Sequence, residues 1–158
     1  MRSQSWRMHD HFRRGCQSLR RHRQATPALI TTCCFQRAPL LSDPDCAGIV
    51  LDALRWMDTH QRLILHAAVV MPDHLHFVAD PLDGDWPQLL ASMKGFSARR
   101  INRRLNRRGA VWQSQYHDRH VGSDRDLALA VDYCLRNPVR AGLVATAGDY
   151  PHVWSRYG

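Results

Sequence analysis

The stretch Val69 to Pro81 reads VVMPDHLHFVADP and predicts two strands joined by a tight turn at Pro72. Side chains two positions apart lie on one face of a strand, so His74 and His76 project together while Leu75 points into the core. A buried strand gains nothing from histidine, because each ring nitrogen needs a hydrogen-bond partner. A strand that binds a divalent cation gains from both rings, so the pair indicates a candidate metal site, although this spacing is frequent by chance.

The elements on either side of this stretch predict an α+β fold. Strands are expected where short runs are rich in β-branched and apolar residues, and two of the helices begin at Ser or Asp capping residues. The order strand-helix-strand-strand-helix-strand-helix predicts an antiparallel sheet with the helices packed on one face. The expected strands span residues 27–35, 63–71, 74–79 and 112–121, and the expected helices span 42–60, 86–108 and 124–136, the last ended by Asn137-Pro138.

Length and composition are those of one globular domain with a basic N-terminal segment. The chain has 158 residues and five cysteines, whose odd number and spacing match no metal-binding pair and favour reduced thiols in a cytoplasmic protein. Residues 1–26 are rich in Arg and His without apolar periodicity, so we expect a flexible basic arm before a domain at residues 27–158. No apolar run approaches the roughly 20 residues that span a bilayer, so no membrane segment is expected.

The charge of the chain points to nucleic acid. The formal net charge is +8, and of 22 basic residues only Lys94 is a lysine. Arginine binds phosphate in a bidentate manner and stacks on bases, whereas codon bias in a GC-rich genome would explain the choice of arginine but not the positive excess. The second half of the predicted helix at 86–108 places apolar side chains in one sector and arginines over the opposite half. Together with Lys94, these arginines either bind a polyanion or form a solvated surface: Arg99, Arg100, Arg103, Arg104, Arg107 and Arg108.

A second group of candidate residues lies at the end of the predicted helix at 124–136. Tyr133 and Asn137 are four positions apart and would share a helix face. The carbonyl oxygen of an asparagine can complete a metal site, and a phenol beside a metal-bound phosphate can act as a nucleophile. From the residues alone, a core tyrosine with its hydroxyl at the rim is the more common arrangement.

Three motifs, taken in this order and at this spacing, resemble those of the REP-associated tyrosine transposases, a domesticated branch of the HUH single-tyrosine transposases. The motifs are MPDHLHFV (71–78), WQSQYHDRHV (112–121) and VDYCLRNPVRAGLV (131–144), of which the third is the most specific. The resemblance runs from about Ala28 to Tyr157 and implies a ferredoxin-like sandwich with the two histidines on a central strand. It also implies the following site: His74, His76 and Asn137 as metal ligands, Tyr133 as the nucleophile, Mg²⁺ or Mn²⁺ as the cofactor, and single-stranded DNA at the foot of REP-type hairpins as the substrate.

The resemblance implies a mechanism in which the Tyr133 oxygen attacks the scissile phosphate in line, leaving a 5′-phosphotyrosine and a free 3′-hydroxyl. The covalent link conserves the energy of the phosphodiester, so a later 3′-hydroxyl can rejoin the strand without ATP. The arginines would hold the DNA backbone. Trp112, Tyr116 or His117 could stack on unpaired bases, although core packing is the favoured role of Trp112. We expect a bacterial, cytoplasmic and nucleoid-associated protein that acts as a monomer or homodimer.

Two other functions remain open at this point. The chain could bind structured single-stranded nucleic acid without turnover, or it could be a metal-dependent phosphoesterase that uses water, with Tyr133 structural. Because Asn137 precedes a proline, which disfavours helical geometry, Asp73, Asp80 or water could replace it as a metal ligand. His66, on the preceding strand, is expected to be a core histidine.

Overall fold

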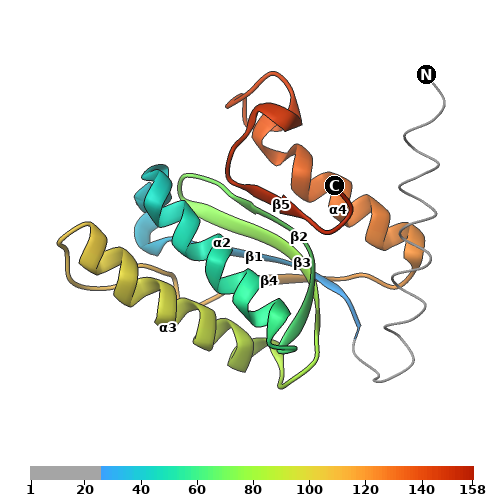
Figure 1. Ribbon diagram of the computed structural model, residues 1–158, viewed down its shortest axis with the longest axis horizontal. Helices are drawn as coiled ribbons and strands as arrows, with labels where there is room; N and C mark the ends of the chain where they lie inside the picture. Colours follow the sequence, from blue (N-terminus) through green and yellow to red (C-terminus); the bar gives the residue numbers. More distant parts are fainter. Residues whose placement is uncertain (1–25) are drawn as a thin grey trace.

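The computed structural model describes residues 26–158, so the predicted arm at 1–26 lies outside the described residues apart from Thr26. In this part of the chain, five antiparallel strands form one sheet in the order β4-β1-β3-β2-β5, with three α-helices packed against it (Figure 1). The predicted α+β fold is confirmed, and β3 lies at the centre of the sheet. The elements are β1 (Ala28–Cys33), η1 (Phe35–Arg37), η2 (Leu40–Ser42), α2 (Pro44–Thr59), β2 (Leu63–Val70), β3 (His74–Pro81), α3 (Trp86–Arg104), β4 (His117–His120), α4 (Asp124–Arg140), η3 (Ala147–Asp149) and β5 (Val153–Ser155).

The central strand β3 pairs with β1 on one side and with β2 on the other, which fixes the register of the two histidines. His76 lies opposite Thr31 of β1 and Val69 of β2, and His74 lies opposite Cys33 of β1. Residues that lie directly opposite each other on neighbouring strands point to the same face of a sheet. The register therefore brings the side chains of Thr31 and Cys33 to the face that carries the histidines.

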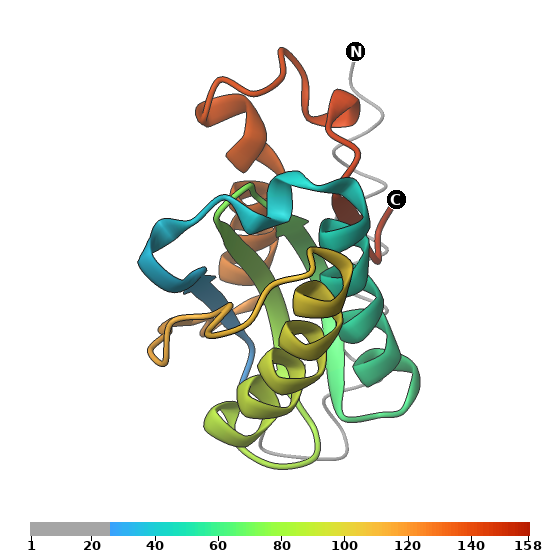
Figure 2. The same cartoon turned by 90° about the vertical axis from the view of Figure 1, so that its left-hand side faces the viewer.

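The helices cover both faces of the sheet, which corrects the prediction that they pack on one face. α2 and α3 pack on the face that carries Phe77, whereas α4 packs on the face that carries Val69 and Val78. Every residue of β2 is buried, because apolar side chains on both of its faces need cover. Figures 1 and 2 show α4 across the sheet from α2 and α3. As a result, α4 lies on the same face as His74 and His76.

Helix α4 runs through Pro138 to Arg140, whereas the sequence predicted its end at Asn137. A proline in a helix removes one donor, here the one for the carbonyl oxygen of Cys134. Pro138 is buried, and in the same part of the helix the Arg140 guanidinium donates to the carbonyl oxygen of Tyr133. The longer helix keeps Tyr133 and Asn137 on one helical face.

Three further elements differ from the prediction. α3 ends at Arg104 instead of residue 108, because Asn106 takes a left-handed backbone conformation with φ 49°. β4 spans only His117–His120 of the predicted strand at 112–121. The edge strand β5 was not predicted, because Val153–Ser155 is too short to show an alternating pattern.

Two of the helices begin at capping residues that are visible in the sequence. The Asp43 carboxylate accepts hydrogen bonds from the backbone of Asp45 and Cys46 at the start of α2, and Ser123 accepts one from Asp126 at the start of α4. Within residues 26–158, no helix is both long and apolar enough to cross a bilayer.

Candidate metal and tyrosine site

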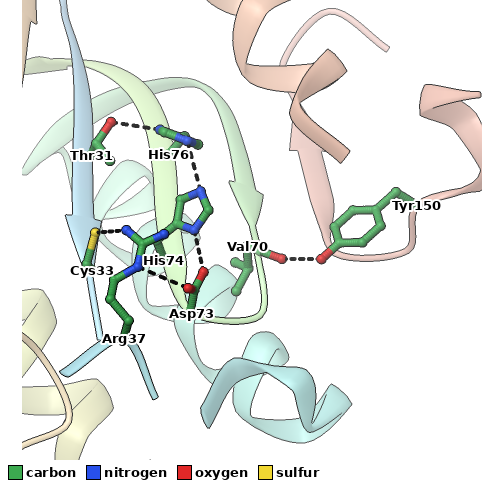
Figure 3. Close-up of polar contacts among 8 residues, drawn as sticks. All are labelled: Thr31, Cys33, Arg37, Val70, Asp73, His74, His76 and Tyr150. Carbon is green, nitrogen blue, oxygen red and sulfur yellow. Dashed lines mark hydrogen bonds and ion pairs between the residues drawn. The ribbon is translucent and has the colours of Figure 1, made fainter. Parts of the chain in front are cut away.

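His74 and His76 point toward each other from β3. Their Nε2 atoms are 3.1 Å apart, and their rings are nearly perpendicular, with an interplanar angle of 86° (Figure 3). Two nitrogen ligands at right angles on one small divalent cation lie roughly 3 Å apart. The pair therefore has the spacing that two ligands of a single metal ion need.

Each imidazole is held in place at its other ring nitrogen. Nδ1 of His74 is 2.7 Å from Oδ1 of Asp73, and Nδ1 of His76 is 2.7 Å from the hydroxyl oxygen of Thr31 (Figure 3). Nε of Arg37 donates to the other oxygen of Asp73 at 3.0 Å. A carboxylate that accepts from Nδ1 leaves the lone pair of Nε2 free, which is the usual arrangement of a metal-binding histidine.

Sequence reasoning missed two of these supporting residues and gave the third another role. Thr31 and Arg37 lie 45 and 36 residues before their partners, and nothing in their local sequence marks them. Asp73 was considered only as a substitute metal ligand, whereas here it binds Nδ1 of His74. Its place directly before the histidine, in the turn that opens β3, was the one available signal.

The electrostatics of the site favour metal-binding protonation states. His76 is 7% exposed, and burial, helped by the positive groups of His74, Arg140 and Arg37, lowers its pKa to about 4. Burial alone would raise the pKa of Asp73, but the hydrogen bond from His74 and the charge of Arg37 hold it below its ordinary value. At neutral pH the site offers a neutral imidazole at His76 and an ionised carboxylate at Asp73, as metal binding requires.

Helix α4 brings Tyr133 to the histidines. The Tyr133 and His76 ring centroids are 6.1 Å apart, with the rings at 80°. The Cys134 thiol donates to the carbonyl oxygen of His76 and so anchors this turn of α4 to β3. Tyr133 is 41% exposed, which does not fit the core-tyrosine interpretation and leaves the side chain open to a large substrate.

Arg140 covers the ring of Tyr133. The guanidinium carbon lies 4.0 Å from the ring centroid, and the same group donates to the Tyr133 carbonyl oxygen. A guanidinium in this position attracts the π-system and stabilises negative charge that develops on the phenol oxygen. Sequence reasoning missed Arg140, although a spacing of seven residues places it almost directly below Tyr133 on the same helix face.

Asn137 is the candidate third ligand. Its side-chain amide nitrogen is buried and has no hydrogen-bond partner within residues 26–158. An unsatisfied buried group costs roughly 1–3 kcal/mol, and an amide N–H donates, so the partner that would satisfy this nitrogen is an acceptor such as a phosphate oxygen. Across the described residues, no three side chains of His, Cys, Asp or Glu are grouped to hold a metal ion. A metal ion held by the two histidines would take its remaining ligands from other groups, for which the side-chain oxygen of Asn137 is the candidate, together with phosphate oxygens.

Lys94, a predicted DNA-binding residue, contacts the protein itself. Its ammonium donates to the carbonyl oxygens of Gln113 and Gln115 at 2.8 and 3.2 Å. Burial lowers its pKa from the ordinary value. Lys94 therefore holds the loop before β4 against α3.

The predicted arginine face is divided between paired and unpaired side chains. Arg104 bridges to Asp45 at 2.8 Å and to Asp43 at 3.6 Å, and Arg107 donates to the Asn102 side chain at 2.7 Å. α3 lies across the sheet from the histidines, so its arginines do not share a face with Tyr133, whereas Arg107 and Arg108 follow the end of the helix. Of the predicted arginine face, the exposed side chains without an ion pair to the described residues are Arg99, Arg100, Arg103 and Arg108.

The other residues considered from the sequence have structural contacts. Trp112 is 7% exposed and donates to Ser97, so it belongs to the core. His66 is 1% exposed and lies 2.6 Å from the Tyr157 hydroxyl and 3.3 Å from Asp80, which confirms it as a core histidine. Asp80 is thus engaged away from the His74–His76 pair. Tyr116 is half-buried and His117 is exposed.

Comparison with known proteins places the chain in a family. Residues 26–136 match the family described as IS200-like transposases. A Haemophilus influenzae protein described as a REP-associated tyrosine transposase is 28% identical over 97 residues, which cover 54% of this chain and 55% of that protein. The chain thus spans about half the length of this curated relative.

Two solved structures share the fold. A REP-associated tyrosine transposase bound to a REP hairpin is similar with a TM-score of 0.65 and 21% identity, over 81% of this chain and 75% of that chain. A structure described as a transposase from Deinococcus radiodurans is similar with a TM-score of 0.53 and 23% identity, over 69% of this chain and 88% of that chain. The family match covers well over half of the chain, and the resemblance predicted from the sequence is confirmed. The chain belongs to the family of IS200-like transposases.

Proposed function

We propose that this protein is a metal-dependent endonuclease and strand transferase that cuts and rejoins single-stranded DNA at REP-type hairpins. The proposal rests mainly on one observation: Tyr133 of α4 lies next to the oriented histidine pair of β3. The solved relative that binds a REP hairpin supports the choice of substrate. Membership in a transposase family supports the choice of reaction.

In the proposed reaction, Tyr133 supplies the nucleophile. Its oxygen forms a bond to phosphorus while the bond from phosphorus to the 3′-oxygen breaks, so the product is a 5′-phosphotyrosine and a 3′-hydroxyl. The phenol proton passes to solvent, and the leaving 3′-oxygen takes up a proton. The Arg140 guanidinium stabilises the phenolate both as the attacking group and as the leaving group when a 3′-hydroxyl later rejoins the strand.

His74, His76 and Asn137 would hold the divalent cation, Mg²⁺ or Mn²⁺. When bound, such an ion neutralises negative charge on the phosphate oxygens. Asp73 and Thr31 keep the two imidazoles aimed at one point. Polar contacts of this kind preserve metal affinity without touching the metal.

The arginines of α3 would contact DNA away from the scissile phosphate, since they lie on the opposite face of the sheet. Arg99, Arg100 and Arg103 are the α3 side chains free to do so, and Arg108, in the loop after α3, is exposed as well. Lys94, Arg104 and Arg107 instead hold the loop and helix ends around them, with the charge of Arg104 balanced by its carboxylate partners. We place the protein in the bacterial cytoplasm, on chromosomal DNA, as a monomer or homodimer, in line with its bacterial relative.

A covalent trapping experiment tests the proposal. The protein is mixed with end-labelled single-stranded DNA that carries hairpins from its own genome, with and without Mn²⁺, and separated under denaturing conditions. We expect a metal-dependent labelled protein band with the wild type and none with Tyr133→Phe, because phenylalanine lacks the attacking oxygen. Tyr133→Phe should still shift the DNA in a native gel, which shows that the variant is folded.

Two outcomes would replace the proposal with one of the alternatives. A wild-type gel shift without any covalent band would make the protein a binder of structured single-stranded DNA. Cleavage by Tyr133→Phe at nearly the wild-type rate would make water the nucleophile and the protein a phosphoesterase.

A further inference from the structure

An open groove of about 650 Å³ lies between α2 and α3, across the sheet from the histidines and Tyr133. Ala53 and Met93 form part of its apolar lining. Two aromatic side chains also line it and remain unusually accessible: Trp56 of α2 is 52% exposed, and Phe96 of α3 is 39% exposed. Large aromatic side chains are rarely left open to solvent side by side without a partner.

The rim of the groove is cationic. Arg99 and Arg100 of α3 both line it, and the Arg100 guanidinium lies 4.5 Å from the centroid of the Phe96 ring. Among the lining residues Asp52 is acidic, but the basic residues outnumber it, so positive charge predominates next to the aromatic rings.

The indole of Trp56 is oriented before any ligand arrives. It stacks on the ring of His60 with a centroid distance of 4.0 Å and an interplanar angle of 20°. His60 is itself held through Nδ1, 2.8 Å from the Trp56 carbonyl oxygen. A fixed aromatic plane loses little conformational entropy when a second flat group stacks on it.

We propose that this groove binds unpaired nucleotides of single-stranded DNA. Bases stack on Trp56 and Phe96, and Arg99 and Arg100 contact the phosphates between them. Aromatic platforms beside a cationic rim are how proteins grip unpaired strands without reading their sequence. The choice of DNA as the ligand rests on the proposed function, whereas the position of the groove is independent of the histidine and tyrosine site.

Charge argues against the other occupants of such a groove. In a symmetric dimer through this surface, Arg99 and Arg100 of both copies would lie close together and repel. Residues 1–25 of this chain are also rich in arginine and would meet the same repulsion. A polyanion with flat bases is the ligand that matches both the charge and the aromatic rings.

The groove and Tyr133 lie on opposite faces, so a strand that reaches both must pass around an edge or end of the sheet. Hairpin DNA with a long unpaired flank can do this, whereas a blunt hairpin cannot. The contribution of the groove should therefore appear only when the flank is long enough.

The test compares two synthetic hairpins, one blunt and one with a long unpaired thymidine flank, by fluorescence anisotropy. The Trp56→Ala/Phe96→Ala double variant should lose about tenfold or more in affinity for the flanked hairpin and little for the blunt one. Gly95→Met should act in the same direction by filling the groove, since a Cβ at Gly95 meets only Arg99, at 3.8 Å. Trp56→Phe keeps a stacking ring and should retain most of the affinity.

Arg55→Ala is the matched control, because Arg55 is exposed on α2 beside Trp56 but does not line the groove. A flank carrying 5-bromodeoxyuridine should cross-link, on irradiation, to peptides that contain Trp56 or Phe96. Wild-type affinity that is equal for both hairpins would overturn the proposal, and so would a double variant that binds the flanked hairpin as the wild type does. A fall from dimer to monomer in Trp56→Ala, with DNA affinity unchanged, would make the groove an interface between copies instead.

The covalent band of Tyr133, measured on the same flanked hairpin, separates this proposal from the proposed function. If the band forms and the groove variants bind normally, only the groove proposal fails. If no band forms but the groove variants lose affinity, the proposed strand transfer fails and the groove remains a DNA site.

Discussion

A chain of contacts runs from Arg37 through Asp73, His74 and His76 to Thr31. Its members come from η1, the turn before β3, β3 itself and β1, so the site is assembled by strand register instead of by a local motif. These contacts hold the Nδ1 atoms of both histidines and leave both Nε2 atoms directed at one point. At this scale, the orientation of the imidazoles depends on residues that would never touch a metal.

Asp73→Asn should weaken metal binding by roughly 10- to 100-fold. The amide keeps the shape of the carboxylate but loses its charge, so the imidazole of His74 becomes a poorer ligand. Calorimetric titration with Mn²⁺ measures the loss. Asp83→Asn is the matched control, because Asp83 is an exposed partner of Arg62 away from the histidines. Equal affinities in the two variants would show that Asp73 does not support the site.

His76 should make the metal-free protein less stable in acid. Its pKa is lowered to about 4 in the folded state, against an ordinary value of 6.5, so only the unfolded chain takes up this proton between these values. The contribution of the neutral His76 side chain to the free energy of unfolding is therefore complete above pH 6.5. It is lost as the pH falls toward 4. Between pH 7 and pH 5 the contribution of His76 to the free energy of unfolding should fall by about 2 kcal/mol.

Urea unfolding at the two pH values, in the presence of a chelator, measures this effect. His76→Gln should be less stable than the wild type at pH 7 but should lose less stability on acidification, because glutamine does not titrate. An identical pH dependence in the two proteins would show that His76 titrates normally in the folded state.

At the residue scale, the sequence groups candidate residues where one element carries the whole pattern. His74 and His76 share a strand, and Tyr133 and Asn137 share a helix face, so periodicity alone groups each pair. Thr31, Arg37 and Arg140 could not be found in this way. Thr31 and Arg37 meet the site through tertiary structure, and Arg140 lies beyond a proline that was expected to end the helix.

At the scale of elements, the helix starts and the end of α2 were predictable, whereas the ends of α3 and α4 were not. Asp43 and Ser123 cap through their own side chains, so the signal is local. α4 continues through the buried Pro138 to Arg140, and α3 ends before Asn106, whose backbone is left-handed. Packing decides both, and a single sequence does not show it.

Two glycines in similar open surroundings should respond in opposite ways to alanine. A Cβ added at Gly48, inside α2, or at Gly142, after α4, meets no atom within 4 Å. Gly48→Ala should raise the free energy of unfolding by about 0.5–1 kcal/mol, because alanine loses less backbone entropy in a helix. Gly142→Ala should lower it by about 1 kcal/mol, because φ is +73° there. Urea denaturation compares the two, and a change of the same sign at both positions would contradict the backbone argument.

At the scale of the whole molecule, the sheet separates two kinds of surface. One face carries the histidines and Tyr133 under α4, and the other carries α2, α3 and the arginines. The prediction of helices on one face had placed these surfaces together. It failed because the order of elements does not assign a helix to a face, whereas the apolar side chains on both faces of β2 require cover on both sides. DNA that uses both surfaces must therefore wrap around the domain.

Neighbouring arginines on α3 should contribute differently to DNA binding. Arg103 is exposed with no ion pair in the described part of the chain, whereas the charge of Arg104 is already balanced by Asp43 and Asp45. Binding of a flanked hairpin, measured from low to high salt, reports the number of phosphates neutralised. Arg103→Ala should reduce the salt slope by about one, because one phosphate contact is lost. Arg104→Ala should leave the slope nearly unchanged and lower the free energy of unfolding by less than about 1 kcal/mol, because an exposed ion pair contributes little. Equal reductions in slope would show that Arg104 exchanges its carboxylates for phosphate, and no reduction in either variant would make this part of α3 an ordinary solvated surface.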